Sequence, residues 1–307
     1  MIIDLHTHTD KSDGELSPFS LLDRARENGV SVISIADHDT LGAYDQGVIS
    51  YAEKIGIMLV PGVEISTVDE RGRKWHILGH FVDPFDLGLR SWLESLRQAR
   101  KTYAKEMIEK LGAIGWQLDE GRLLQFDVIS KAHIADAVID YPSNQSALKK
   151  QFDGHMPSRG EFIESTMNKG CPAYIRRIKS PTPTEAIDVI RRAGGVASVA
   201  HPIAAIYEQN LTFEEIAETI KTFAPDGIEA YYYYFSKSRG DRKFEMVHEF
   251  VDLAKQLDIV PVGGSDFHGV SEKLGNFVDV GMISEDYAMT EEQLALQWPK
   301  HKLYLQL

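Results

Sequence analysis

Histidines and carboxylates recur in short clusters along this 307-residue chain, and most of these clusters directly follow an apolar run. The first cluster is His6-Thr7-His8, and strand residues two positions apart point to the same face. Both imidazoles can then face one ion, because neutral imidazole is a common ligand of zinc, iron and manganese. Taken alone, such a pair is more often two surface histidines. Asp13, the next candidate, stands before a glycine, and an aspartate in that position is more often a turn residue.

Two denser clusters follow. The Asp37-His38-Asp39 cluster ends a β-branched run, and either aspartate could orient His38. Asp39 fits equally well as the N-cap of a following helix. Glu64 lies inside a Val/Ile run, where an acid is costly to bury unless it is paired or bound to a metal. Its two oxygens could bridge two ions, and a buried salt bridge is the alternative.

The remaining candidates also follow strand-like runs. His76 and His80 are four residues apart and share one face of a strand, although a core position is preferred for His80. His201 follows Val-Ala-Ser-Val-Ala, and Asp266 and His268 follow a Gly-Gly pair. Glycines let the backbone turn sharply, which would bring these last two side chains together.

Seven apolar runs predict strands near residues 2–5, 30–36, 57–65, 75–82, 196–200, 227–233 and 259–263. Helical patterns separate most of them, including 43–54, 184–193, 212–223 and 242–257, so we predict an α/β fold with parallel pairing. In barrels of this kind, active groups lie at the carboxyl ends of the strands. The clusters share that position, which is stronger evidence for a common active site than any single motif.

The composition limits the classes of function. The net charge of −13 disfavours membrane surfaces and long duplex nucleic acid, but a metal cluster would still admit a small phosphorylated substrate. A single cysteine, Cys171, excludes a disulfide within the chain and indicates a reducing compartment. No signal peptide or membrane span is predicted, so we expect a cytoplasmic protein.

The motifs together resemble the PHP (polymerase and histidinol phosphatase) superfamily, and most closely its TrpH/YciV-like phosphoesterases. They span nearly the whole chain in order: His6-x-His8, Ser-Asp13-Gly, Ala-Asp-His38-Asp, Gly-Val-Glu64, His76-Ile-Leu-Gly, Ala-His201-Pro and Ser-Asp266-Phe-His268-Gly. The resemblance implies a distorted (βα)7 barrel formed by residues 1–84 and 171–307. It also implies a helical subdomain, residues 85–170, inserted over the active site.

The resemblance further implies a site of two to three divalent cations, which the ligand types suit to manganese, iron or zinc. One ion would take His6, His8, Glu64 and Asp266; a second Glu64, His76 and His201; a third Asp13, His38 and His268. Glu64 would then bridge two ions.

One motif departs from the subgroup. Its members usually carry Gly-Arg-Pro-His in the insertion, whose arginine and histidine reach the substrate phosphate, whereas this chain has Ser130-Lys131-Ala132-His133. His133 is a candidate for substrate binding and for catalysis, by protonating the leaving group. Lys131 is a candidate for phosphate contact, but its point charge cannot bind bidentately as arginine does. A solvated helix residue is the alternative for Lys131.

The function expected from the resemblance is hydrolysis of a small phosphorylated nucleotide, either a 3′,5′-nucleotide bisphosphate or short 5′-phosphorylated RNA. The hypothesised mechanism is in-line attack by a metal-bridging hydroxide. A histidinol-phosphate-type phosphatase and a processive nuclease are alternatives of the same chemistry. A non-catalytic metal-binding regulatory module is the alternative of another class, and the nine filled ligand positions argue against it.

Overall fold

A computed structural model of the chain describes residues 2–123, 126, 129–175, 180–232, 234–236, 242–270 and 278–282. Within them, seven strands form one sheet in the order β1-β2-β3-β4-β5-β6-β9. The strands are β1 (Ile2–Thr7), β2 (Val30–Ile35), β3 (Met58–Val68), β4 (Lys74–His80), β5 (Val196–Val199), β6 (Gly227–Tyr231) and β9 (Val260–Gly263). All seven predicted strands are therefore present.

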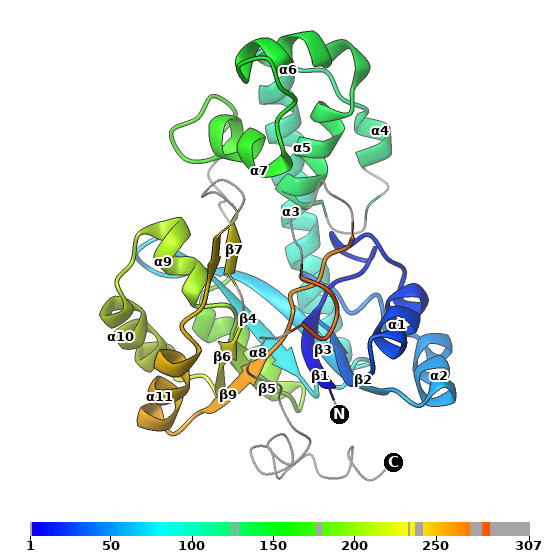
Figure 1. Cartoon of the computed structure of the whole chain (residues 1–307), viewed down its shortest axis with the longest axis vertical. Coiled ribbons are helices and arrows are strands. Elements are labelled where there is room, and N and C mark those ends of the chain that lie inside the picture. The colour runs from blue at the N-terminus through cyan, green and yellow to red at the C-terminus, as the bar shows by residue number, and fades with distance from the viewer. Residues whose placement is uncertain are drawn as a thin grey trace.

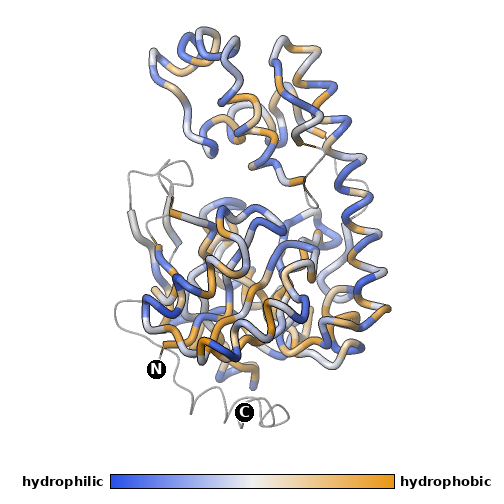
Figure 2. The backbone as a smooth tube through the Cα atoms, turned by 90° about the vertical axis from the view of Figure 1, so that its right-hand side faces the viewer, coloured by the Kyte–Doolittle hydropathy of each residue, from blue (hydrophilic) through white to orange (hydrophobic). Residues whose placement is uncertain are grey.

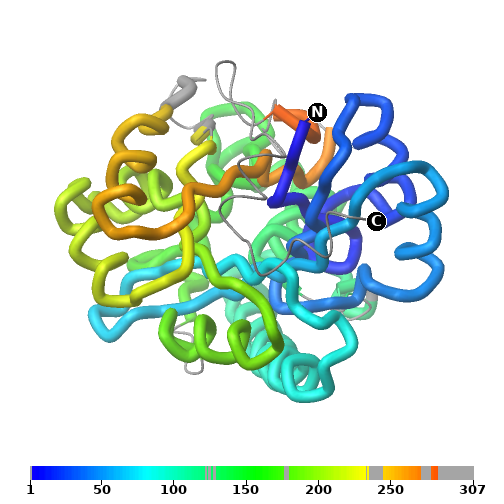
Figure 3. The backbone as a smooth tube through the Cα atoms, turned by 90° about the horizontal axis from the view of Figure 1, so that it is seen from below, coloured from blue at the N-terminus to red at the C-terminus, as the bar shows by residue number. Residues whose placement is uncertain are grey.

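The two end strands of this sheet meet and close it into a barrel. The backbone N–H of His8 donates to the carbonyl of Phe267 at 2.9 Å, and that of Asp266 donates to the carbonyl of His6 at 2.8 Å. Viewed from below, the start of the chain lies beside the orange segment that includes β9 (Figure 3). The predicted distorted (βα)7 barrel is confirmed, with its seam between β1 and β9.

The expected parallel pairing is wrong for one strand. β4 runs antiparallel to both β3 and β5, while the other strand pairs of the barrel are parallel. The reason is the short connection after Val68: Asp69 accepts hydrogen bonds from the backbone of Arg71 and Arg73 and forms a tight turn. A tight turn joins antiparallel neighbours, whereas a parallel pair needs a longer crossover.

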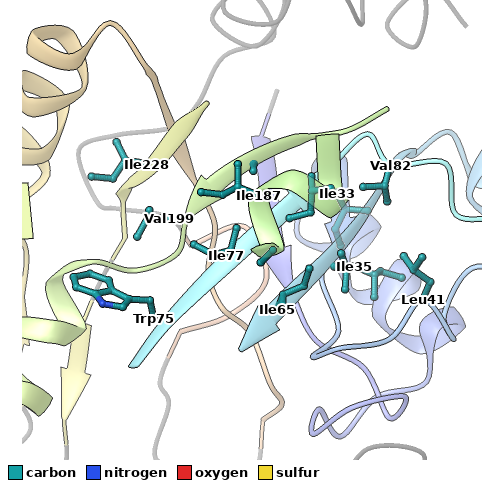
Figure 4. Packing of buried hydrophobic residues seen from close by; sticks show 14 of the residues in the cluster. Ile33, Ile35, Leu41, Ile65, Trp75, Ile77, Val82, Ile187, Val199 and Ile228 are labelled. Atoms are coloured by element: carbon teal, nitrogen blue, oxygen red, sulfur yellow. The ribbon is translucent and has the colours of Figure 1, made fainter. Parts of the chain in front are cut away.

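Helices pack around the barrel and bury its outer face. They are α1 (Pro18–Glu27), α2 (Gln46–Ile55), α8 (Pro183–Arg192), α9 (Ile203–Gln209), α10 (Phe213–Phe223) and α11 (Val247–Leu257). Figure 4 shows Ile187 of α8 packed beside Ile77 and Ile65 of the sheet. A smaller apolar cluster fills the barrel and includes Ile3 and Leu5 of β1.

A helical segment stands above the carboxyl end of β1 (Figure 1). It contains α3 (Leu87–Ala113), α4 (Glu120–Leu123), α5 (Lys131–Ile139), the 3₁₀ turn η1 (Pro142–Asn144), α6 (Gln145–Gln151), α7 (Arg159–Phe162) and the π-helical turn η2 (Ile163–Met167). This segment has its own apolar core, which includes Met107 and Phe162. We call it the helical insertion.

The long helix α3 joins this insertion to the barrel. Its first turns place Leu89 and Leu93 in the barrel core, and its later turns place Met107 and Leu111 in the core of the insertion. Hydrophilic and apolar turns alternate along it (Figure 2), as expected of a helix that buries one side. One continuous helix therefore belongs to both hydrophobic cores.

Element boundaries differ from the prediction in several places. The helix expected over 242–257 begins only at Val247, because Arg242–Phe244 forms a short strand, β8, that pairs with β7 (Tyr234–Ser236). The strand expected over 227–233 ends at Tyr231. Among the described residues, no helix combines the length and the apolar character needed to cross a membrane.

The barrel seam generates a prediction at Gly264. A Cβ on this residue would stand 2.2 Å from the Cβ of His6 and 2.5 Å from its backbone nitrogen. The segment after β9 can therefore approach β1 only because residue 264 has no side chain. We expect Gly264→Ala to lower the free energy of unfolding by about 1–3 kcal/mol, as overpacking does.

Gly112→Ala in α3 is the matched control. Nothing lies within 4 Å of the Cβ it would add, so we expect it to raise the free energy of unfolding by about 0.5–1 kcal/mol. Denaturant unfolding of both variants measures the two changes, and equal stability of the two would contradict the steric interpretation of the seam.

Candidate metal centre

The nine predicted metal ligands converge at one end of the barrel. They come from β1 and the loop after it, from the residues following β2, β5 and β9, and from within β3 and β4: His6, His8, Asp13, His38, Glu64, His76, His201, Asp266 and His268. Eight of them occur in three groups whose potential ligand atoms lie within 4.8 Å of one another. The ninth, His201, joins them through its Nε2, which lies 3.0 Å from Oε1 of Glu64.

The most regular group is His6, His8, Glu64 and Asp266. The Nε2 atoms of the two histidines are 3.1 Å apart. Oε2 of Glu64 lies 3.4 Å from each Nε2, and Oδ1 of Asp266 lies 3.4 Å and 3.1 Å from them. Four ligands at about 2.1 Å from one tetrahedral ion are separated by about 3.4 Å. The spacing of these four side chains therefore fits a single ion.

Glu64 divides its two oxygens between two groups. Oε1 lies 2.9 Å from Nδ1 of His76 and 3.0 Å from Nε2 of His201. Oε2 faces His6 and His8 and lies 2.9 Å from Nδ1 of His38. Glu64 stands inside β3 rather than at its end, but the parallel part of β3 ends at Pro61, so Glu64 still faces the site.

The third group is His8, Asp13, His38 and His268. Oδ1 of Asp13 lies 3.4 Å from Nε2 of His268, and Oδ2 lies 3.9 Å from Nε2 of His38. Asp13 is thus more than a turn residue. In this group and the previous one, three buried atoms lie close to one another or to a neighbouring ligand but make no hydrogen bond of regular geometry: Asp13 Oδ1, His38 Nδ1 and Glu64 Oε2. Buried polar atoms that face one another without regular hydrogen bonds fit a site for cations.

The electrostatics depend on burial and on close opposite charges. Burial disfavours protonated His201, but the hydrogen bond and charge of Glu64 outweigh it and raise the pKa of His201 to about 9. Burial likewise opposes protonation of His268, and the charges of Asp266 and Asp13 raise its pKa to about 9. His8 behaves differently, because burial and the charge of His268 lower its pKa to about 3.

Three buried acids behind the cluster orient its members. Glu229 accepts from Nδ1 of His6 at 3.0 Å and from the backbone of His201 at 2.6 Å, which turns Nε2 of His6 toward the group. Asp4 accepts from the backbone and hydroxyl of Ser265, next to Asp266. Glu229 and Asp4 were not predicted from the sequence, although each is an acid inside an apolar strand, the pattern that identified Glu64.

The third acid is Asp37, which holds the loop before Asp13 by accepting from Thr9 and Ser12. Asp39 accepts from the backbone of Ser66 and forms an ion pair with Arg100 of α3. Neither aspartate hydrogen-bonds the ring of His38, so the predicted orienting role is wrong. The N-cap expected of Asp39 is also wrong, because Asp45 caps α2.

Left-handed backbone marks this end of the barrel. Asp39, His201 and Asp266 have positive φ angles of 52°, 25° and 53°. Such conformations are strained for residues with a side chain and persist where the surroundings hold them. The contacts of Glu229 to His201 and of Arg100 to Asp39 supply that restraint. Tyr232, also missed from sequence, donates its hydroxyl to Oδ2 of Asp266 at 3.1 Å.

His80 has the core position preferred for it. It is fully buried, its Nε2 lies 2.7 Å from the carbonyl oxygen of Leu5, and burial lowers its pKa to about 4. A neutral imidazole that donates to a backbone carbonyl is a structural residue.

Lys131 and His133 make contacts within the insertion. Nζ of Lys131 donates to the carbonyl of Met167 at 3.0 Å and to Oδ1 of Asn168 at 2.9 Å. His133 forms a capping box with Ser130 and stacks on Phe126, with ring centroids 4.1 Å apart.

Comparison with known proteins agrees with this geometry. A family model described as the PHP domain matches residues 4–157. A 5′-3′ exoribonuclease of Haemophilus influenzae is 32% identical over 270 residues, which cover 86% of this chain and 89% of the relative. A 3′,5′-nucleoside bisphosphate phosphatase of Chromobacterium violaceum is 28% identical over 88% of each chain.

Two solved structures resemble the whole chain. A candidate metal-dependent phosphoesterase from Bifidobacterium adolescentis superposes with a TM-score of 0.76 at 25% identity, over 97% of this chain and 96% of the other. An amidohydrolase from Chromobacterium violaceum with bound sulfate and no metal superposes with a TM-score of 0.73 at 26% identity, over 96% of each.

The closed barrel and the histidine–carboxylate cluster at its carboxyl end define a metal-dependent hydrolase. The chain belongs to the PHP domain family, and its reaction class is the hydrolysis of phosphoric esters.

The raised pKa values predict proton release on metal binding. At pH 7, His201 and His268 carry protons in the metal-free protein, because their pKa values are about 9, and a histidine must be neutral to bind a metal. We expect Mn²⁺ uptake at pH 7 to release protons, and metal affinity to rise as the pH is raised toward 9. Calorimetry in buffers of different ionisation enthalpy measures the release, and a buffer-independent heat would contradict the prediction.

The contact between Glu229 and His6 predicts a loss of metal affinity in Glu229→Gln. An amide cannot hold the imidazole N–H as a carboxylate does, so we expect metal affinity to fall roughly 10- to 100-fold. Competition with a chelator measures the change. Glu53→Gln, on the exposed side of α2, is the control. Equal metal affinities of the two variants would contradict the proposed role of Glu229 in orienting His6.

Proposed function

We propose that this protein hydrolyses a small phosphorylated nucleotide, either a 3′,5′-nucleotide bisphosphate or short 5′-phosphorylated RNA, with two to three divalent cations. The observation that carries this proposal is the convergence of six histidines and three carboxylates, with the two oxygens of Glu64 facing different groups. Manganese, iron and zinc suit these ligands, since the site contains no thiolate.

The proposed ligand sets follow the groups described above. His6, His8, Glu64 and Asp266 would hold one ion, Glu64, His76 and His201 a second, and Asp13, His38 and His268 a third. Bound divalent cations would activate a water and polarise the phosphoryl oxygens. Three carboxylates do not neutralise three divalent ions, so the loaded site would remain positive and attract a phosphate.

Two properties of the chain support a nucleotide of limited size. The curated relatives include a bisphosphate phosphatase and an exoribonuclease that match over most of their lengths. The net charge of −13 opposes extended contact with long nucleic acid, whose backbone is itself negative. A small nucleotide or a short oligomer avoids that repulsion while it reaches the positive site.

We further propose a division of labour within the chain. Residues 1–84 and 171–307 form the catalytic barrel, and residues 85–170 form the insertion that covers the active site. The separate apolar core of the insertion supports this division. His133 would bind the substrate and assist the leaving group from above the cluster.

The proposal predicts that His6→Ala and His201→Ala each abolish turnover and deplete bound metal. Each change removes one nitrogen from a group of three or four ligands, so we expect activity to fall roughly 100-fold or more, because the metal that activates the water is lost. Activity with Mn²⁺ and elemental analysis check both effects. His248→Ala, at an exposed position of α11, is the control, and full activity in both cluster variants would overturn the proposal.

A panel of substrates separates the remaining possibilities. We expect turnover of adenosine 3′,5′-bisphosphate or of short 5′-phosphorylated RNA with Mn²⁺, and little turnover of AMP. Preferential hydrolysis of histidinol phosphate would instead identify a histidinol-phosphate-type phosphatase. Failure on every phosphoester would favour a non-catalytic metal-binding role.

A further inference from the structure

The helix α3 carries two arginines in the turns between its two hydrophobic contacts. Leu93 belongs to the core of the barrel, and Ala104 belongs to the core of the helical insertion. Arg97 and Arg100 lie between them, and residues three apart on a helix share one face. Arg100 is buried, which is costly for a guanidinium unless a charged or polar partner compensates it.

The partners of both arginines belong to the segment that carries His38. Nε of Arg100 contacts Oδ2 of Asp39, which is itself buried. Nη1 of Arg97 donates to the hydroxyl of Thr40 at 2.7 Å. The two residues that directly follow His38 are thus both held by side chains of α3.

The same ion pair reaches the strand that carries Glu64. Nη2 of Arg100 donates to the hydroxyl of Ser66 at 2.7 Å, and the backbone N–H of Ser66 donates to Oδ1 of Asp39 at 3.1 Å. The backbone N–H of Asp39 donates to the carbonyl of Glu64 at 2.8 Å. Arg100 and Asp39 therefore join the segment after β2 to β3 in one buried network.

Buried carboxylates fix the backbone on both sides of His38. Asp37 is hydrogen-bonded to the loop after β1, and Asp39 is held by Arg100. Asp39 has a φ of 52°, a left-handed conformation that a residue with a side chain keeps only under restraint. Neither carboxylate hydrogen-bonds the ring of His38, so both act on the ring through the backbone.

We propose that Arg100 is a positioning residue for His38, and that it couples the third ion to the docking of the helical insertion. The inference rests on the proposed function, which supplies the third ligand set: Asp13, His38 and His268. Because α3 enters the core of the insertion, the contact that fixes His38 also fixes this helix against the barrel. Linkage is reciprocal, so binding of the third ion would favour the docked insertion by the same factor.

The test is to titrate Mn²⁺ into variants of Arg100 by equilibrium dialysis and calorimetry. Arg100→Met leaves Asp39 without its cationic partner, so we expect the affinity for the third ion to fall roughly 10- to 100-fold, as when the partner of a metal ligand is removed. We expect the other two affinities to stay close to those of the wild type, because Glu64 is held in the ladder between β3 and β4.

A conservative variant separates positioning from general destabilisation. Arg100→Lys keeps the positive charge beside Asp39 and loses the fork that also reaches Ser66. We expect it to recover part of the lost affinity for the third ion. It also decides the question if Arg100→Met does not fold, since affinity equal to that of the wild type in Arg100→Lys would contradict the need for the fork.

Two further variants calibrate the measurement. His38→Ala removes a ligand of the third ion, and it therefore identifies which step of the titration belongs to that ion. Arg73→Met is the matched control: Nε of Arg73 donates to Asp69 at 2.6 Å and Nη2 donates to the hydroxyl of Thr219 at 3.0 Å, and neither partner is a predicted ligand. We expect all Mn²⁺ affinities of Arg73→Met to equal those of the wild type.

Hydrogen exchange measures the reciprocal effect on α3. We expect the backbone amides of residues 97–104 to exchange roughly 10-fold more slowly when Mn²⁺ binds the wild type, because the third ion would stabilise the docked helix. The slowing should be smaller in His38→Ala and in Arg100→Met. Equal slowing in all three proteins would contradict the coupling.

The outcomes distinguish this inference from the proposed function. Loss of the same ion in Arg100→Met and His38→Ala supports the positioning role, whether or not a phosphoester is hydrolysed. Binding like that of the wild type in folded Arg100→Met, or loss of the same ion in Arg73→Met, overturns it and leaves the proposed function standing. Binding like that of the wild type in His38→Ala overturns the third ligand set, and this inference with it.

Discussion

The burial of one carboxylate governs this end of the molecule. Glu64 is fully buried, and an isolated ionised acid in that position would be strongly destabilising. Its oxygens instead face five histidines that come from four strands or strand ends: His6, His8, His38, His76 and His201. These neighbours hold the pKa of Glu64 well below its usual range against the opposing effect of burial. The barrel must therefore keep positive charge, from protons or from cations, around this residue.

Other buried acids keep that arrangement rigid. Glu229 joins β6 to His6 of β1 and to His201 after β5, and Asp4 joins β1 to the loop after β9. Arg100 extends the network into α3, because it contacts Asp39 beside His38 and Ser66 near Glu64. The same helix enters the core of the insertion. The position of the insertion is thus connected to that of the cluster through one buried ion pair.

The pattern of residues predicted most of the fold because its signals are local. Strands such as 30–36 and helices such as α8, with a capping box at Thr182, are encoded by apolar periodicity and end residues. The antiparallel direction of β4 was not predictable in this way, because direction depends on how the chain returns after Val68. The late start of α11 was missed because pairing between β7 and β8 overrides the helical pattern over 242–246.

The sequence by itself indicated the nine candidate ligands. Eight are histidines or carboxylates in or just after an apolar run, and Asp13 was added by the resemblance of its motif to the PHP superfamily. Only the tertiary structure decided how these ligands are divided among the groups. It directed the two oxygens of Glu64 to different groups, gave Asp37 and Asp39 roles other than orienting His38, and added Glu229. These roles depend on distances between residues far apart in the chain. Spacing along a chain does not contain such distances, whereas the closure of the barrel and the packing of the insertion set them.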